Sequence, residues 1–221
     1  MESLEIEIKA LKSSLLEMWF MVINQLDDAR MSMFTSDSIL AGEVHARERL
    51  LDSFEIRHDK ACEQIIAQFH PVEEDLRLIL ASLKINYNLE RIGDYANYIG
   101  NTVRRSEFNF DPGLLKKIHL AEMFEITHVM LVQSYESFNA GESRLVKKFT
   151  VPDKKLDDLK KASSLILGEH IGSHPGEAAM VLELFAIISK LERVGDHCRN
   201  IAEEIIFYLE DRVVKHKKIN K

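Results

Sequence analysis

Apolar residues recur every three or four positions along almost the whole chain of 221 residues. The first stripe consists of Leu4, Ile8, Leu11, Leu15, Met18, Val22 and Leu26. This spacing covers one face of an α-helix, whereas a half-buried strand would alternate. The pattern is interrupted at 35–37, 69–71, 106–113, 139–141 and 172–176, which contain proline, glycine or helix-capping residues. We therefore predict six long helices, three on each side of the turn at 111–113.

The two halves of the chain resemble each other. The segment LERIGD at 89–94 recurs as LERVGD at 191–196, with five of six positions identical. Met18-Trp19 corresponds to Met123-Phe124, an offset of 105 residues. A nearly constant offset indicates an internal duplication. The predicted fold is all-α, with two tandem, pseudo-symmetric three-helix bundles. The predicted units are residues 1–107, residues 114–214 and a basic tail at 215–221.

Composition and charge narrow the possible classes of protein. Glycine and proline number only 9 and 4, which disfavours a turn-rich sandwich or barrel. The formal net charge of −7 argues against nucleic acid as the main partner, because phosphate binding needs a basic face. Cys62 and Cys198 are too few for a disulfide framework and are expected to be reduced core thiols. Without a signal-peptide pattern or an apolar run of about 18 residues, we expect a cytosolic protein.

Carboxylates spaced four residues apart occur on the second and third predicted helix of each half. The pairs are Glu48/Asp52 and Glu90/Asp94 in the first half, and Asp153/Asp157 and Glu192/Asp196 in the second. This spacing places both members of a pair on one helix face. Among 36 acidic residues, about six such pairs are expected by chance. A single pair is therefore not evidence of a functional site. The evidence is that both pairs recur at equivalent positions in the two halves.

The acidic pairs on the third helices continue stripes that begin apolar. At about 100° per residue, Leu83 and Tyr87 lie on the same face as Glu90 and Asp94, and the second half repeats this arrangement. We therefore expect an inward-facing stripe that turns acidic. Like charges at this spacing cost about 0.2–0.5 kcal/mol even when exposed. Four carboxylates converging between two helices call for a compensating cation.

Two kinds of cation would compensate these charges, and the sequence leaves both open. A hard metal ion would take the carboxylate oxygens directly, and all-oxygen ligation suits magnesium, calcium, manganese or iron. Alternatively, arginine side chains would fold over the acids without any metal. The candidate arginines are Arg91, Arg193, Arg47 and Arg49.

Glycine and proline positions refine this prediction. Gly93 and Gly195 lie inside predicted helices, where glycine costs about 1 kcal/mol relative to alanine, so we expect neighbouring helices to approach closely there. Pro152 occurs where the first half has Arg47. Because an interior proline removes a helical hydrogen bond, Asp153 is expected to begin a new helix. The second acidic group should therefore differ from the first.

The segments at 89–94 and 191–203, together with Pro71 and the Asp75-Leu76-Arg77 run, resemble the PhoU family of phosphate-uptake regulators. The resemblance implies two three-helix bundles that bind metal through E/D-x-x-x-D motifs. Here these motifs are Glu48/Asp52, Glu90/Asp94, Asp153/Asp157 and Glu192/Asp196. It also implies a non-catalytic regulator at the membrane face, which acts with the phosphate ABC transporter and its sensor histidine kinase. The first motif lacks the family's Asn-Ile-Ala ending, which is present at 200–202, and this departure weakens the carry-over of a role to Asn97.

Two other function classes remain open. A ferritin-like di-metal oxidase needs Glu-x-x-His motifs on facing helices. Glu55/His58 and Glu125/His128 have this spacing, but they are not equivalent under the repeat, and both histidines are expected to be partly exposed. A metal-free docking module would instead use the acidic faces to bind a basic partner.

Catalytic and phosphate-binding motifs are not found. The chain contains no nucleophile–base arrangement and no glycine-rich phosphate loop. We therefore predict that the protein is not an enzyme and does not bind free phosphate directly. Long amphipathic helices with spare apolar faces also favour a homodimer.

Overall fold

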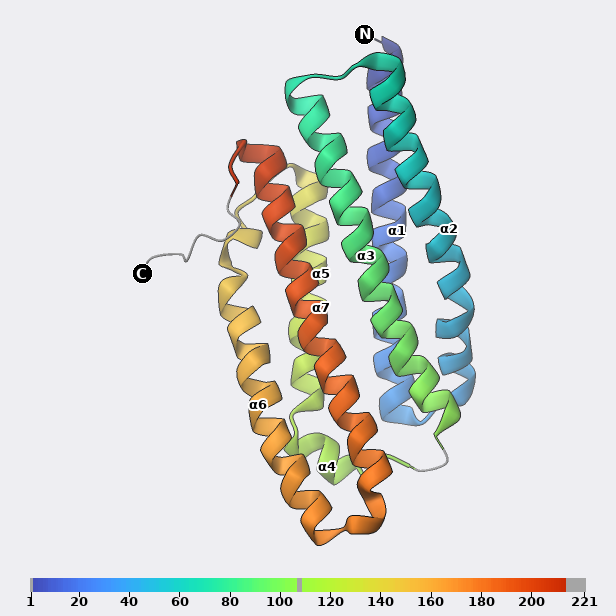
Figure 1. The fold of residues 1–221 in the computed structure, drawn as a ribbon, viewed down its shortest axis with the longest axis vertical. Helices are drawn as coiled ribbons and strands as arrows, with labels where there is room; N and C mark the ends of the chain where they lie inside the picture. Colours follow the sequence, from blue (N-terminus) through green and yellow to red (C-terminus); the bar gives the residue numbers. More distant parts are fainter. Residues whose placement is uncertain (1, 107–108, 214–221) are drawn as a thin grey trace.

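The computed structural model describes residues 2–106 and 109–213 (Figure 1). Its elements are α1 (Glu2–Thr35), α2 (Ser38–Phe69), α3 (Glu73–Arg105), α4 (Pro112–Lys117), α5 (Leu120–Ala140), η1 (Val146–Lys148), α6 (Thr150–Ser173), η2 (Pro175–Glu177) and α7 (Ala178–Glu210). All regular structure in these residues is helical, which confirms the predicted class. The short α4 and the two 3₁₀ helices were not predicted. The basic tail at 215–221 lies outside the described residues.

Local capping explains where the helices begin. Asp37 follows the end of α1 at Thr35, and its side chain accepts hydrogen bonds from two backbone N–H groups in the first turn of α2. Asp111 caps α4 in the same way. Pro112 opens α4, where the missing N–H removes no helical hydrogen bond. The interruptions in the apolar pattern therefore coincide with helix boundaries.

The second bundle departs from the first at the start of α6. Residues 143–149 form turns and η1, and α6 begins at Thr150. Pro152 lies in the first turn, where proline is tolerated. Asp153 also lies in this turn, where its charge interacts favourably with the positive end of the helix. The predicted new helix near Asp153 is confirmed, but it begins at Thr150, three residues earlier.

α1, α2 and α3 form one bundle, and α5, α6 and α7 form the other. α3 and α7 lie side by side at the centre of the molecule, with α2 and α6 at the outer edges (Figure 1). α1 and α5 make a second contact between the bundles. Most of the buried apolar residues form one continuous cluster from Leu15 in α1 to Ile206 in α7, and Leu11, Cys62, Ile65 and Ile79 form a smaller second cluster. The two bundles therefore share a core.

The two cysteines are in the buried, unbridged state expected from the sequence. Cys62 and Cys198 are both buried and unbridged. Within the described ranges, no helix combines the length and apolar character needed to cross a bilayer.

Candidate functional site

The first acidic cluster lies between α2 and α3. It consists of Glu48, Asp52, Glu90 and Asp94. Burial and a hydrogen bond with Asp94 raise the pKa of Glu48 to about 8. Burial and the charge of Asp94 also raise the pKa of Glu90 to about 7. Asp52 is exposed at the edge and acts on both through its charge. At neutral pH the cluster therefore retains protons, because burial and the neighbouring carboxylates disfavour the charged forms of Glu48 and Glu90.

One guanidinium group enters the first cluster. Arg91 Nη1 donates to Asp94 Oδ2 at 2.8 Å, and Arg91 Nε lies 3.2 Å from Glu90 Oε2. The Arg91 guanidinium also lies over the ring of Tyr87, 5.2 Å from its centroid. Glu90 Oε2 and Arg91 Nε are buried without a hydrogen bond, so their contact is poorly aligned. Arg91 reduces the negative charge but leaves one carboxylate oxygen unsatisfied.

A third helix also reaches the first cluster. Gln25 of α1 is fully buried, at 0% exposure. Its Nε2 donates to the backbone oxygen of Val44 at 3.1 Å and to Glu48 Oε2 at 3.2 Å. Gln25 was not identified from the sequence. The available signal was an amide within the apolar stripe of α1, next to Leu26.

The second acidic cluster lies between α6 and α7. It consists of Asp153, Asp157, Glu192 and Asp196. Burial raises the pKa of Asp153, although the charge of Arg199 opposes this shift. Arg199 lies 3.2 Å from Asp153 and 3.2 Å from Asp196. Lys160 Nζ lies 3.0 Å from Glu192. Among the residues that the structure describes, two basic side chains therefore contact this cluster, whereas one contacts the first.

Arg199 and Lys160 were missed from the sequence. Arg199 follows Asp196 by three residues, and Lys160 follows Asp157 by three. This spacing is the signal that would have identified both side chains. The packing of α6 against α7 was needed to show that Arg199 also reaches Asp153.

Three of the arginines predicted to cover the acids form no described ion pair with them. Arg193 contacts the Tyr95 hydroxyl, and Arg47 forms an ion pair with Asp28 of α1. Arg49 is exposed. Of the four candidates, only Arg91 pairs with the predicted carboxylates among the described contacts.

The two glycines allow the close helix contacts that were predicted. A Cβ atom at Gly93 would lie 2.7 Å from Leu51 Cδ1 and 3.3 Å from Gln25 Oε1. A Cβ atom at Gly195 would overlap Leu156 Cδ1. Both glycines are adjacent in sequence to a cluster carboxylate. They allow the helix that carries the other acidic pair to approach.

The prediction that the acidic stripe of α3 faces the core is wrong. Tyr87 on this stripe is 50% exposed, whereas Leu89 and Ile92 on the opposite stripe are fully buried. The side chains of Glu90 and Asp94 are 12% and 34% exposed. The acids lie at the half-buried margin of the α2–α3 contact, because the other apolar face of α3 occupies the interior.

The acidic clusters have the oxygen donors that hard cations prefer. As the side chains stand, the described part of the chain contains no group of three or more His, Cys, Asp or Glu residues that could hold a metal ion. The carboxylates instead pair with Arg91 in the first cluster and with Arg199 and Lys160 in the second. Glu90 Oε2 is a buried oxygen without a hydrogen bond. The residues fit a hard cation in donor type, and binding would require the basic side chains to move aside.

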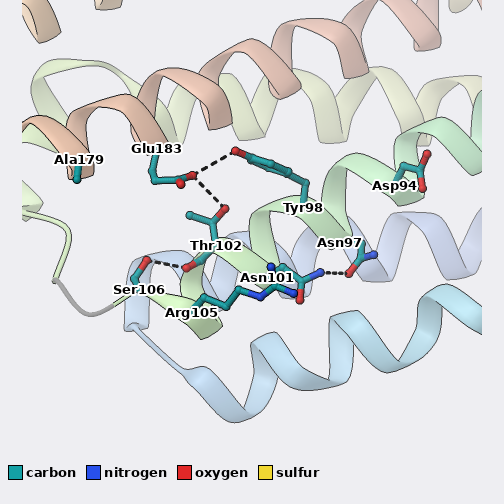
Figure 2. Close-up of a pocket in the computed structure, with 9 residues that line it drawn as sticks. All are labelled: Asp94, Asn97, Tyr98, Asn101, Thr102, Arg105, Ser106, Ala179 and Glu183. Carbon is teal, nitrogen blue, oxygen red and sulfur yellow. Dashed lines mark hydrogen bonds between the residues drawn. The ribbon is translucent and has the colours of Figure 1, made fainter.

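A polar cleft of about 460 Å³ follows the α3–α7 contact beside the first cluster (Figure 2). The Tyr98 hydroxyl donates to Glu183 Oε2 at 3.2 Å, and the Thr102 hydroxyl donates to the same oxygen at 3.5 Å. Asn101 Nδ2 donates to Asn97 Oδ1 at 2.8 Å. The cleft is therefore crossed by hydrogen bonds between the two bundles.

The family model described as the PhoU domain matches the chain twice, at residues 15–103 and 120–205. The chain belongs to the PhoU family. It is 31% identical over 204 residues to phosphate-specific transport system accessory protein PhoU homolog 1 of Thermotoga maritima, covering 92% of this chain and 87% of that protein. It is 29% identical over 210 residues to phosphate-specific transport system accessory protein PhoU of Escherichia coli, covering 95% and 86%. The crystal structure of PhoU from Pseudomonas aeruginosa superposes with a TM-score of 0.85 at 26% identity, covering 94% and 99%.

The two PhoU matches correspond to the two bundles. The first extends from α1 to α3 and the second from α5 to α7, so α4 falls between them. Each PhoU match therefore contains one complete acidic cluster.

The two Glu-x-x-His motifs lie in different bundles of the PhoU fold. His58 is 2% exposed, neither ring nitrogen is hydrogen-bonded, and burial lowers its pKa to about 4. The expectation of a partly exposed His58 is wrong, because its face of α2 packs inward. His128 is half-buried, and its Nδ1 lies 2.8 Å from Asp27. Glu125 pairs with Arg30 at 3.3 Å. The two motifs therefore lie in different surroundings: His58 is buried without a described hydrogen bond, whereas His128 and Glu125 contact residues of α1.

Proposed function

We propose that this PhoU-family protein is a non-catalytic regulator of phosphate uptake and phosphate-starvation signalling. It acts with the phosphate ABC transporter and its sensor histidine kinase at the cytoplasmic face of the inner membrane. The observation that carries the proposal is the match to phosphate-specific transport system accessory proteins over more than nine-tenths of the chain. Regulation through the transporter and kinase is consistent with two predictions, the absence of catalysis and of direct phosphate binding.

A complementation experiment tests this role. The chain is expressed in a bacterium that lacks its own PhoU protein. In phosphate-rich medium, we expect lower uptake of radiolabelled phosphate and repression of a phosphate-starvation reporter. If the folded protein accumulates without changing either measurement, the proposed role is contradicted for that transporter and kinase.

The acidic clusters are proposed to bind hard cations, either divalent ions or iron. Glu48, Asp52, Glu90 and Asp94 would hold cations in the first cluster, and the equivalent carboxylates would do so in the second. A bound cation would neutralise charge that Arg91 compensates only in part. The raised pKa of Glu48 supports this proposal, because burial and the nearby Asp94 and Asp52 carboxylates disfavour a negative charge that a bound cation would stabilise.

Metal analysis of protein purified without a chelator tests cation binding. Glu90→Gln combined with Asp94→Asn should lower the metal content by about half if the clusters load independently. Added Mn²⁺ should also raise the melting temperature of the wild type, because a ligand that binds the folded state stabilises it. If the purified protein contains no metal and divalent ions leave its melting temperature unchanged, these results would instead favour the metal-free docking module. Oxygen consumption with ferrous iron would favour the oxidase.

The exposed apolar side chains of α1 support the proposal of a homodimer. Phe20, Met31 and Phe34 are 58%, 54% and 41% exposed. If these side chains form a contiguous exposed apolar patch, such a patch is typical of interaction surfaces. Light scattering should give twice the chain mass, and a monomeric mass would contradict the proposal.

A further inference from the structure

We propose that Gln25 of α1 is a positioning residue for cation binding in the first acidic cluster. Its contact makes this cluster a tighter cation site than the second. The inference rests on the proposed cation role of the clusters, and it adds a residue from a third helix to a site otherwise built by two.

The orientation of the Gln25 amide is determined by its neighbours. Nε2 lies 3.1 Å from the backbone oxygen of Val44 and 3.2 Å from Glu48 Oε2. A backbone carbonyl oxygen can only accept a hydrogen bond, so the amide atom that faces Val44 must be the nitrogen. The second N–H is therefore available to the Glu48 carboxylate. Gln25 holds Glu48 from the side of α1.

The surroundings leave Gln25 little freedom. Its side chain is 0% exposed, and its Oε1 is buried without a hydrogen-bond partner. A Cβ atom at Gly93 would lie 3.3 Å from this oxygen, so the glycine leaves room for the amide. A buried acceptor without a partner is destabilising. An apolar side chain at this interior position would avoid the penalty of the unpartnered oxygen. The fold nevertheless keeps the Gln25 amide there, in contact with the candidate ligand Glu48.

Holding a ligand carboxylate in place strengthens metal binding. Groups that donate hydrogen bonds to metal ligands orient them, and their loss typically lowers metal affinity by about 10–100-fold. Gln25 has this relation to Glu48. It also connects α1 to a cluster whose carboxylates all come from α2 and α3.

The second cluster lacks the equivalent contact. The offset of 105 residues that relates Met18 to Met123 places Met130 at the position of Gln25. Met130 is 1% exposed, and its thioether has no N–H to donate. Two basic side chains, Arg199 and Lys160, contact the second cluster, and a metal ion would have to displace them. Both differences favour tighter binding in the first cluster.

The test measures each cluster separately with Mn²⁺ in the full-length, chelator-treated protein. The double substitution Glu192→Gln with Asp196→Asn removes two carboxylates of the second cluster and so disables it. The concentration of free Mn²⁺ is then measured from its electron paramagnetic resonance signal. In this background, Gln25→Met should raise the Mn²⁺ dissociation constant about 10–100-fold. Gln133→Met is the matched control, because Gln133 of α5 makes no described side-chain hydrogen bond to any of the eight carboxylates. This control should leave the constant unchanged.

The reciprocal background shows whether the effect is local. With Glu90→Gln and Asp94→Asn, only the second cluster remains, and Gln25→Met should not change its dissociation constant. That constant should also exceed the constant of the intact first cluster. Because Gln25→Met removes a buried amide with an unpartnered oxygen, the metal-free variant should melt no lower than its parent. If it fails to fold, Gln25→Asn makes the same comparison with an amide too short to reach Glu48.

The outcomes separate this inference from the broader proposal. If the wild-type protein binds no Mn²⁺, the cation role itself fails, and the inference fails with it. If Mn²⁺ binds but Gln25→Met leaves the constant of the first cluster unchanged, only the role of Gln25 is overturned. Equal weakening of both clusters would also overturn it, because the effect would then be structural.

Discussion

The pKa of Glu48 depends on its burial and on the charged residues around it. Glu48 is half-buried, shares a hydrogen bond with Asp94, and lies close enough to Asp52 for their charges to interact. Gln25 opposes the resulting pKa increase but does not cancel it. The metal-free protein therefore folds with a proton on Glu48 that the unfolded chain has released at neutral pH.

This difference predicts that metal-free protein loses stability as the pH rises. The pKa of Glu48 is about 8 in the folded state against 4.5 for the ordinary group. The folded state therefore binds more protons between these values, and its stability falls as pH rises through them. Between pH 6.5 and 8, the stability of the Glu48→Gln variant should fall less steeply with pH than that of the wild type. The raised pKa of Glu90 should account for the fall that remains. Melting temperatures in the presence of a chelator measure the effect, at about 2–4 °C for each kcal/mol.

Two comparisons make the pH prediction specific. Glu43→Gln removes an exposed carboxylate from the same helix and should retain the wild-type pH profile. Below pH 6.5, His58 acts in the opposite direction, because its lowered pKa of about 4 makes the folded state lose stability as the pH falls. Parallel profiles for wild type and Glu48→Gln between pH 6.5 and 8 would contradict the assignment to Glu48.

At the scale of elements, glycines determine how closely α2 can approach α3. A Cβ atom at Gly93 would meet Leu51, and one at Gly100 would lie 3.0 Å from Val44 Cγ1. Leu51 and Val44 are both almost completely buried. Neither side chain can move aside without disturbing the core. The close approach brings the two acidic pairs of the first cluster together.

Gly93→Ala should therefore destabilise the protein although alanine favours helices. Overpacking of a filled core costs about 1–3 kcal/mol, which exceeds the gain of about 1 kcal/mol in helix propensity. Gly168→Ala is the matched control in α6, because nothing lies within 4 Å of its Cβ position. The control should gain up to about 1 kcal/mol. Urea unfolding measures both, and a Gly93→Ala variant as stable as the control would contradict the packing argument.

At the scale of the whole molecule, the two bundles are joined by polar and apolar contacts. His197 Nδ1 lies 2.7 Å from Asn88 Oδ1 across the α3–α7 contact. Lys84 Nζ lies 3.0 Å from Glu204, whose side chain is 3% exposed. The apolar cluster continues beneath these contacts from one bundle to the other. Neither bundle can unfold without exposing buried surface of its partner.

The shared core predicts one cooperative unfolding transition. Calorimetry of the full-length protein should give equal calorimetric and van't Hoff enthalpies. Leu156→Ala in the second bundle removes a fully buried side chain and should cost about 2–5 kcal/mol. It should lower the temperature of the single transition without splitting it. Two resolved transitions, with only one shifted by Leu156→Ala, would show that the bundles unfold independently.

Local patterns in the sequence determined the six long helices and the breaks between them, but not α4 or the two 3₁₀ helices. Apolar spacing, the capping residues Asp37 and Asp111 and the proline at 152 act within a few residues, so they can be recognised without a fold. The repeated LER-x-GD segments similarly identified the duplication and the PhoU resemblance. All eight candidate carboxylates were named from their spacing, because i, i+4 positions share a helix face.

Contacts between helices were decided only by the tertiary structure. Spacing along one helix did not show that Gln25 holds Glu48, that Arg199 reaches Asp153, or that Arg193 turns towards Tyr95. The same limit explains the error about the acidic stripe of α3. A helix with two apolar faces does not reveal which face the neighbouring helices cover. Periodicity specifies which residues share a face, whereas packing decides what that face meets.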